Sequence, residues 1–152
     1  MGQKMITLGQ LSDFSATERA QLQAACDLVN KCLADPAFIA ILNGCAYDNT
    51  TDDVPTIVKN ITAPMTIIRM YCEDMGWWAT HWSKTIAEES PDGTVTFNRA
   101  FFDDQDSPSL ANTLFHEACH VAGYSHYSST DYASVPYQAG NKLEDYARSL
   151  SS

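Results

Sequence analysis

The sequence predicts a small α+β fold, in which a mixed or antiparallel sheet packs against a central helix and further helices lie towards both ends of the chain. Apolar residues recur at helical spacing near the N-terminus, at 108–122 and near the C-terminus. The run Met65–Cys72 is rich in Ile and Met with some alternation, as expected of a strand. The letters S-P-D-G at 90–93 mark a turn between two further strand-like runs.

Three helices are expected in the first half of the chain, at 15–34, at 37–42 and from Pro55 onwards. Ser15 is the candidate N-cap of the first helix, and Glu18 completes a capping box with it. The apolar stripe of that helix consists of Leu22, Ala25, Leu28, Val29 and Cys32. These residues predict a long amphipathic helix that packs on the core.

The second half of the chain is expected to hold a hairpin and two helices. The hairpin strands are placed at Thr85–Glu89 and Thr94–Phe97. The central helix is placed from Pro108 to about Ala122, with Ser107 as its cap, and it is apolar almost all round. A last helix is expected from about Gln138 to Leu150. A helix with so little polar surface is expected to be buried.

Length and charge limit the classes of function. At 152 residues, the chain is expected to form one domain that spans 1–152. No apolar run approaches the ~20 residues that a membrane span needs. The net charge of −10 argues against nucleic acid and anionic membranes as partners, because both attract basic patches. The N-terminal run lacks the sustained apolar segment of a signal peptide, while few lysines and many Ser and Thr residues mildly favour a secreted or extracytoplasmic protein.

The five cysteines allow two interpretations. Cys26, Cys32, Cys45 and Cys72 could form two disulfide bridges, with three possible connectivities. Cys119 would then be left over in the central helix. The alternative is five buried thiols, each of which packs as a small apolar side chain.

The central helix carries the most informative motif of the chain. Residues 116–126 read H-E-A-C-H-V-A-G-Y-S-H, which fits the pattern H-E-x-x-H-x-x-G-x-x-H. His116 and His120 are four residues apart and lie about one turn apart on one helix face, so both imidazoles can bind one metal ion. Glu117 is turned about 100° from His116 along the helix, and can reach a water on that metal without being a ligand. The pattern therefore predicts one catalytic zinc ion per chain.

The third metal ligand has three candidates. Gly123 can adopt a positive φ, end the helix and turn the chain so that His126 reaches the metal. Asp131, in S-T-D-Y, and Glu144, in the C-terminal helical stretch, are the alternatives. Imidazole is the commonest metal ligand, and His126 has the better spacing, so His126 is preferred. Any of the three leaves one metal position open for water.

The residues of this motif resemble the metzincin zinc peptidases. That resemblance implies that His116, His120 and His126 bind zinc, that Glu117 is the general base and that Gly123 makes the turn. It also implies a peptide or protein substrate, and an edge strand shortly before the zinc helix that lines the cleft. Metzincins place a methionine turn below the zinc, downstream of the third histidine. The methionines of this chain all lie upstream, at Met1, Met5, Met65, Met70 and Met75. The resemblance is therefore to a divergent or minimal member without that turn.

The expected function is peptide-bond hydrolysis by a metal-activated water, with Glu117 as general base. Tyr132 and Tyr137 fall where a hydroxyl could stabilise the developing oxyanion. Two other functions fit the same residues. One is a non-catalytic zinc-binding or structural module, and the other is a secreted effector or toxin protease with a narrow target.

Overall fold

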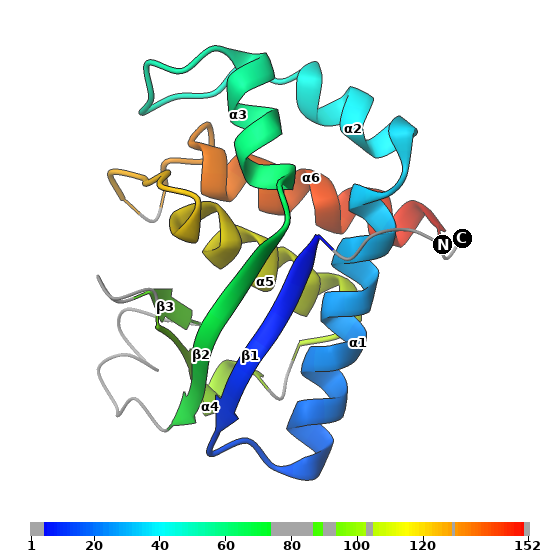
Figure 1. Cartoon of the computed structure of the whole chain (residues 1–152), viewed down its shortest axis with the longest axis vertical. Coiled ribbons are helices and arrows are strands. Elements are labelled where there is room, and N and C mark those ends of the chain that lie inside the picture. The colour runs from blue at the N-terminus through cyan, green and yellow to red at the C-terminus, as the bar shows by residue number, and fades with distance from the viewer. Residues whose placement is uncertain (1–4, 74–86, 90–93, 103–104, 129, 151–152) are drawn as a thin grey trace.

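A computed structural model describes residues 5–73, 87–89, 94–102, 105–128 and 130–150. In chain order the elements are β1 (Ile6–Ser12), α1 (Ala16–Leu33), α2 (Pro36–Asn43), α3 (Val54–Thr62), β2 (Met65–Glu73), β3 (Ala87–Glu89), β4 (Val95–Asn98), α4 (Arg99–Phe102), α5 (Ser107–Val121) and α6 (Val135–Leu150), shown in Figure 1. The helices and strands expected from the sequence are all present among them.

The sheet has four described strands in the order β1-β2-β4-β3. β1 pairs with β2, and β2 with β4, in parallel, whereas β3 and β4 form an antiparallel pair with Ala87 opposite Phe97. The combination of helices with a sheet is confirmed. Of the two sheet types expected, the sheet is mixed, and the antiparallel alternative is wrong. β1 and β2 are parallel because the helices α1, α2 and α3 connect them, and such a crossover brings the chain back in the same direction.

The antiparallel pairing of β3 with β4 confirms the expected hairpin. The strand at the edge of the sheet is, however, not the one expected. β4 lies between β2 and β3, so the strand that directly precedes α4 and α5 is an interior strand. Among the described strands, the edge strand on this side is β3, at Ala87–Glu89. The other parts of the expected hairpin, residues 85–86 and the turn at 90–93, lie outside the described residues.

The helix ends agree with the sequence in most places and differ in two. Ser15 caps α1, and the capping box with Glu18 is complete. The cap of α5 is Asp106 rather than Ser107, because its carboxylate accepts from the Ser109 N–H at 3.0 Å. α6 begins at Val135, three residues before the expected start at Gln138, since proline is tolerated in a first helical turn.

The β1 strand was not expected from the sequence. Its residues are mostly half-buried or exposed, and Ile6 is its one fully buried residue. The Asn30 side chain of α1 fixes its start: Asn30 Oδ1 accepts from the N–H groups of Met5 and Ile6 at 3.0 and 2.8 Å, and Asn30 Nδ2 donates to the Ile6 carbonyl at 2.9 Å. Hydrogen bonds from a residue 24 positions away in sequence thus hold this strand, although the sequence of the strand itself shows only a weak strand pattern.

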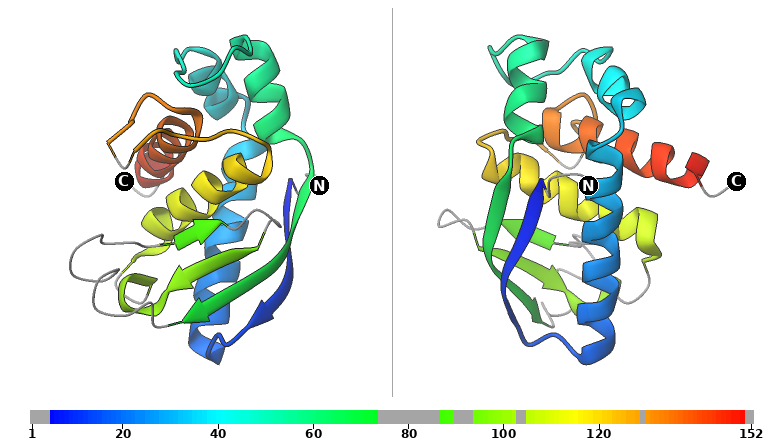
Figure 2. Two further views of the ribbon diagram at one scale, coloured as in Figure 1. Left: turned by 90° about the vertical axis from the view of Figure 1, so that its left-hand side faces the viewer. Right: turned by 45° about the vertical axis from the view of Figure 1, so that its right-hand side comes forward.

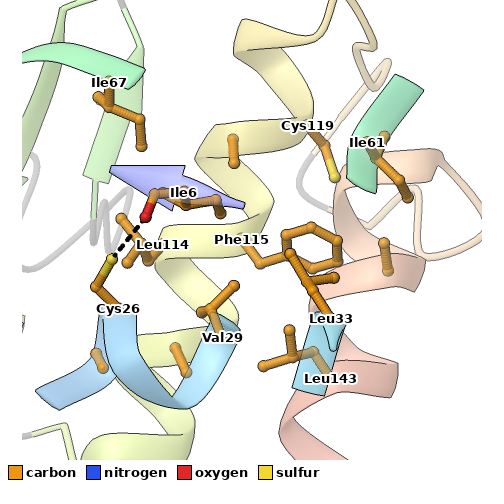
Figure 3. Packing of buried hydrophobic residues seen from close by; sticks show 14 of the residues in the cluster. Ile6, Cys26, Val29, Leu33, Ile61, Ile67, Leu114, Phe115, Cys119 and Leu143 are labelled. Carbon is orange, nitrogen blue, oxygen red and sulfur yellow. Dashed lines mark hydrogen bonds between the residues drawn. The ribbon is translucent and has the colours of Figure 1, made fainter. Parts of the chain in front are cut away.

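The α5 helix is the centre of the core, as the sequence predicts. Figure 2 shows α5 between the sheet and α6, with α1 beside it. In Figure 3 its residues Leu114, Phe115 and Cys119 face side chains from the sheet, α1, α3 and α6. The labelled partners are Ile6, Ile67, Cys26, Val29, Leu33, Ile61 and Leu143. The apolar side of α5 is therefore buried in the core. No helix among the described residues is long and apolar enough to cross a membrane.

All five cysteines are free thiols, so of the two interpretations the one with two disulfide bridges is wrong, and the one with packed thiols holds for the four cysteines that are buried. Four of them are buried, and Cys45 is half-buried. Cys26 donates a weak hydrogen bond to the Ile6 carbonyl at 3.5 Å, which is drawn in Figure 3. The fold is held by packing around α5 rather than by covalent links.

Candidate metal centre

The helix α5 brings together three of the predicted site residues. His116 and His120 approach each other with their Nε2 atoms 3.2 Å apart. Two nitrogens that bind one zinc ion tetrahedrally at about 2.0–2.1 Å lie about 3.3 Å from each other. The separation in this structure therefore fits a shared ion. Glu117, between the two histidines in sequence, is buried with 3% of its surface exposed.

A tight turn after α5 carries the third histidine back towards the first two. Gly123 has a φ of +102°, and its N–H donates to the His120 carbonyl at 2.9 Å. The next N–H, of Tyr124, donates to the Cys119 carbonyl at 3.0 Å, which completes a Schellman motif. His126 then lies with its ring centre 5.2 Å from that of His116 and 4.9 Å from that of His120. The role predicted for Gly123 as the turn is confirmed.

The three histidines form a group that could hold a metal ion. One potential ligand atom from each of His116, His120 and His126 lies within 4.8 Å of the other two. His126 Nδ1 is also buried and makes no hydrogen bond of ordinary geometry among the described residues, although the Ser128 backbone is close enough to act on the pKa of His126. An interior nitrogen without a partner is costly, and a bound cation or water beside it removes that cost. The donor set and its spacing thus fit a metal.

The two alternative third ligands are not in this group. The Asp131 carboxylate accepts from the Tyr127 N–H at 3.1 Å, which closes the loop after His126. Glu144 lies at the junction of α5 and α6, where it accepts from Asn112 Nδ2 at 2.8 Å and pairs with Arg148 at 2.8 Å. Each carboxylate therefore has a structural role of its own in the described part of the chain.

A carbonyl oxygen orients the His120 ring. His120 Nδ1 lies 2.9 Å from the Tyr124 carbonyl oxygen. A carbonyl can only accept, so the proton of the neutral ring must be on Nδ1. Nε2 then has its lone pair free on the side that faces His116. This is the arrangement by which proteins commonly orient a metal-binding histidine.

Burial keeps the three imidazoles neutral. It lowers the pKa of His116 to about 3, and the charges of His120 and His126 act in the same direction. Burial also lowers the pKa of His120 and that of His126, although Asp131 opposes the shift at His126. Metal binding needs the neutral ring. The site is therefore in its metal-binding protonation state at neutral pH.

These pKa shifts predict a pH dependence for the metal-free protein. His116 titrates at about 6.5 when unfolded and at about 3 when folded. Between these values the unfolded chain binds more protons, so the free energy of unfolding falls as the pH falls. For His116 alone, the loss from pH 7.5 to pH 5.0 is expected to be about 2 kcal/mol.

Urea unfolding of chelator-treated protein at the two pH values measures this loss. Carboxylates with lowered pKa values, such as Asp106 at about 2, begin to contribute only at lower pH. The His116→Asn variant should show a smaller difference between the two pH values. Equal stability of the unmodified protein at pH 7.5 and 5.0 would contradict the interpretation.

The two candidate tyrosines lie at different depths. Tyr137, in the first turn of α6, packs against two of the histidines, with its ring centre 4.6 Å from that of His116 and 4.6 Å from that of His126. Burial raises the pKa of Tyr137, and the charges of Tyr132, Glu117 and Asp131 raise it further. Its hydroxyl thus keeps its proton and can donate. Tyr132 packs edge-on against Tyr137 at 5.7 Å and is 61% exposed, so it lies one ring further out.

Sequence reasoning missed a set of residues that hold the loop after α5. The Tyr124 hydroxyl donates to Asp52 Oδ2 at 2.7 Å and accepts from Asn60 Nδ2 at 3.0 Å. Asn49 Nδ2 also donates to Ser125 Oγ at 3.1 Å. These partners are 64 to 76 residues apart in sequence. No local pattern in the sequence indicates such pairs.

The site as a whole combines three neutral imidazoles, a buried carboxylate and a phenol that can donate. Comparison of the chain with protein-family models, curated proteins and solved structures found no match.

Proposed function

We propose that this protein is a zinc-dependent peptidase. The observation that carries the proposal is the convergence of His116, His120 and His126, with the buried Glu117 directly after His116 on the same helix. A purely structural zinc site is closed by four protein ligands, whereas three ligands leave one metal position open. Three converging histidines therefore favour a hydrolytic centre over a structural one.

Zinc is the metal that this donor set favours. Imidazole nitrogens suit it, and the 3.2 Å separation of the two Nε2 atoms matches its tetrahedral geometry. When bound, zinc polarises a carbonyl oxygen and lowers the pKa of a coordinated water to about 7. One zinc ion per chain is proposed, held by His116, His120 and His126.

Glu117 is proposed to move the protons of the reaction. Its carboxylate accepts a proton from the attacking water and later delivers it to the leaving amine. Glu117 acts on Tyr137, because the charge of its carboxylate helps to raise the pKa of that phenol. The surrounding side chains exclude bulk water from Glu117, so its interaction with a nearby cation is stronger than it would be at the surface.

Tyr137 is proposed to stabilise the oxyanion that forms at the scissile carbonyl. It lies against His116 and His126, and its protonated hydroxyl can donate a hydrogen bond. A donor that is already in place needs no rearrangement when charge develops. Tyr132 supports the Tyr137 ring from its exposed side in this proposal.

An extended peptide is the proposed substrate. β3 contacts α5 and is the edge strand on that side in the described part of the sheet. A strand edge offers backbone donors and acceptors to a peptide of any sequence. The net charge of −10 favours neutral or basic peptides over acidic ones through steering, and disfavours nucleic acid.

Removal and return of the metal test the proposal. The purified protein is expected to contain one zinc ion per chain, measured by elemental analysis, and to cleave members of a random peptide library. A chelator should abolish cleavage, and stoichiometric zinc should restore it. Magnesium should not restore cleavage, because it prefers oxygen ligands.

Three other outcomes would each lead to a different conclusion about the function. If metal-free, folded protein takes up no zinc, the metal centre is wrong. Zinc uptake without cleavage of any library peptide or protein points to a non-catalytic module. Cleavage of a single protein target, with the library and casein left intact, identifies a narrow effector protease.

A further inference from the structure

We propose that Tyr124, held by Asp52 and Asn60, is a positioning residue of the metal centre. The inference rests on the proposed zinc site and adds to it the residues that set its geometry. Tyr124 directly follows the Gly123 turn and precedes His126 by two residues. It therefore connects the helix that carries two of the histidines to the loop that carries the third.

Each polar group of Tyr124 is engaged. Its N–H donates to Cys119 at the end of α5, and its carbonyl accepts from His120 Nδ1. Its ring is buried with 7% of the residue exposed, and its hydroxyl joins Asp52 and Asn60. The residue is thus fixed at both its backbone and its ring tip, and its carbonyl in turn fixes the His120 ring.

The segment 48–60, which contains Asp52 and Asn60, holds the loop 124–133 at two further points. Asn49 donates to Ser125, next to Tyr124, and the Asp48 N–H donates to the Ala133 carbonyl at 2.9 Å. Residues 48–60 therefore hold both ends of the loop 124–133. A loop of this length without such anchors would lose conformational entropy each time its histidine bound the metal. An anchored loop has already lost that entropy on folding, so the metal binds more tightly.

The anchoring hydroxyl can be removed with little change in shape. Tyr124→Phe keeps the ring and the carbonyl, and Asp52→Ala removes the acceptor from an exposed residue. Tyr146→Phe is the matched control, because the Tyr146 hydroxyl also donates to an aspartate, Asp35. Asp35 caps α2 and is far from the three histidines in sequence. All three variants lose one tyrosine–aspartate hydrogen bond.

Zinc affinity in competition with a chromophoric chelator is the first measurement. Tyr124→Phe and Asp52→Ala are each expected to weaken zinc binding about tenfold, the lower end of the range for residues that support metal ligands. The double variant should be no weaker than the more affected single variant, because both changes remove the same bond. Tyr146→Phe should lower the Tm to a similar extent and leave zinc affinity unchanged.

The second measurement is a long-range proton–nitrogen NMR spectrum of the metal-free protein. His120 should carry its proton on Nδ1 alone in the unmodified protein, and a mixture of tautomers should appear in Tyr124→Phe. Wild-type zinc affinity in Tyr124→Phe, or equal weakening in Tyr146→Phe, would overturn the inference. Both readouts are independent of catalysis, so a protein that binds zinc but cleaves nothing overturns the peptidase proposal and not this one.

Discussion

Glu117→Gln is expected to leave zinc bound and to lower the rate of peptide hydrolysis by about 10²–10⁴-fold, the usual contribution of a general base. Glutamine has nearly the shape of glutamate, so it fits the same buried position on α5. An amide cannot accept the proton of the attacking water at neutral pH. The loss should therefore be in kcat, with zinc content and Tm close to those of the unmodified protein.

Glu144→Gln is the matched control for this prediction. Glu144 is also a helical glutamate close to α5, but it pairs with Arg148 and Asn112 outside the histidine group. We expect its variant to keep both zinc and activity, with a modest loss of stability. If Glu117→Gln cleaved peptides at the wild-type rate, Glu117 could not be the general base. If Glu144→Gln lost zinc instead, Glu144 would have to be a ligand.

The central part of the site could be predicted because its geometry is local. His116 and His120 share a helix face through the 3.6-residue period, and Gly123 provides the positive φ that turns the chain. His126 follows within three residues of that glycine. All of this information lies within one continuous stretch of sequence. The structure places these residues together in the way that the spacing predicts.

The rest of the molecule depends on partners that are distant in sequence. β1 is held by Asn30 and by parallel pairing with β2, and its own residues have only a weak strand pattern. The antiparallel alternative for the sheet was wrong for the same reason. The alternation of residues in a strand shows which of them face the core. It does not show which strand pairs with it, or whether that strand runs parallel or antiparallel. The Asp52–Tyr124–Asn60 contacts were missed because single polar residues give no signal of the partner that they find.

The alternative third ligand, Asp131, is close enough to the site to need a direct test. Its charge acts on the pKa of His126 and on that of Tyr137. It is nevertheless outside the group of converging ligand atoms, and its carboxylate accepts from the Tyr127 N–H. Asp131→Asn keeps an oxygen for that N–H while it removes the charge that a metal would need. It therefore separates a role in the loop from a role in the metal centre.

His126→Ala is expected to weaken zinc binding on the order of a hundredfold or more, because it removes one of three protein ligands. Asp131→Asn should leave zinc affinity nearly unchanged, as measured by the same chelator competition. The structure gives the reason: the rings of His116, His120 and His126 converge, and Asp131 closes the loop behind them. Reversed outcomes would make aspartate the third ligand and the metzincin resemblance misleading. Hydrolysis would remain possible, since either residue completes a three-ligand site with an open position for water.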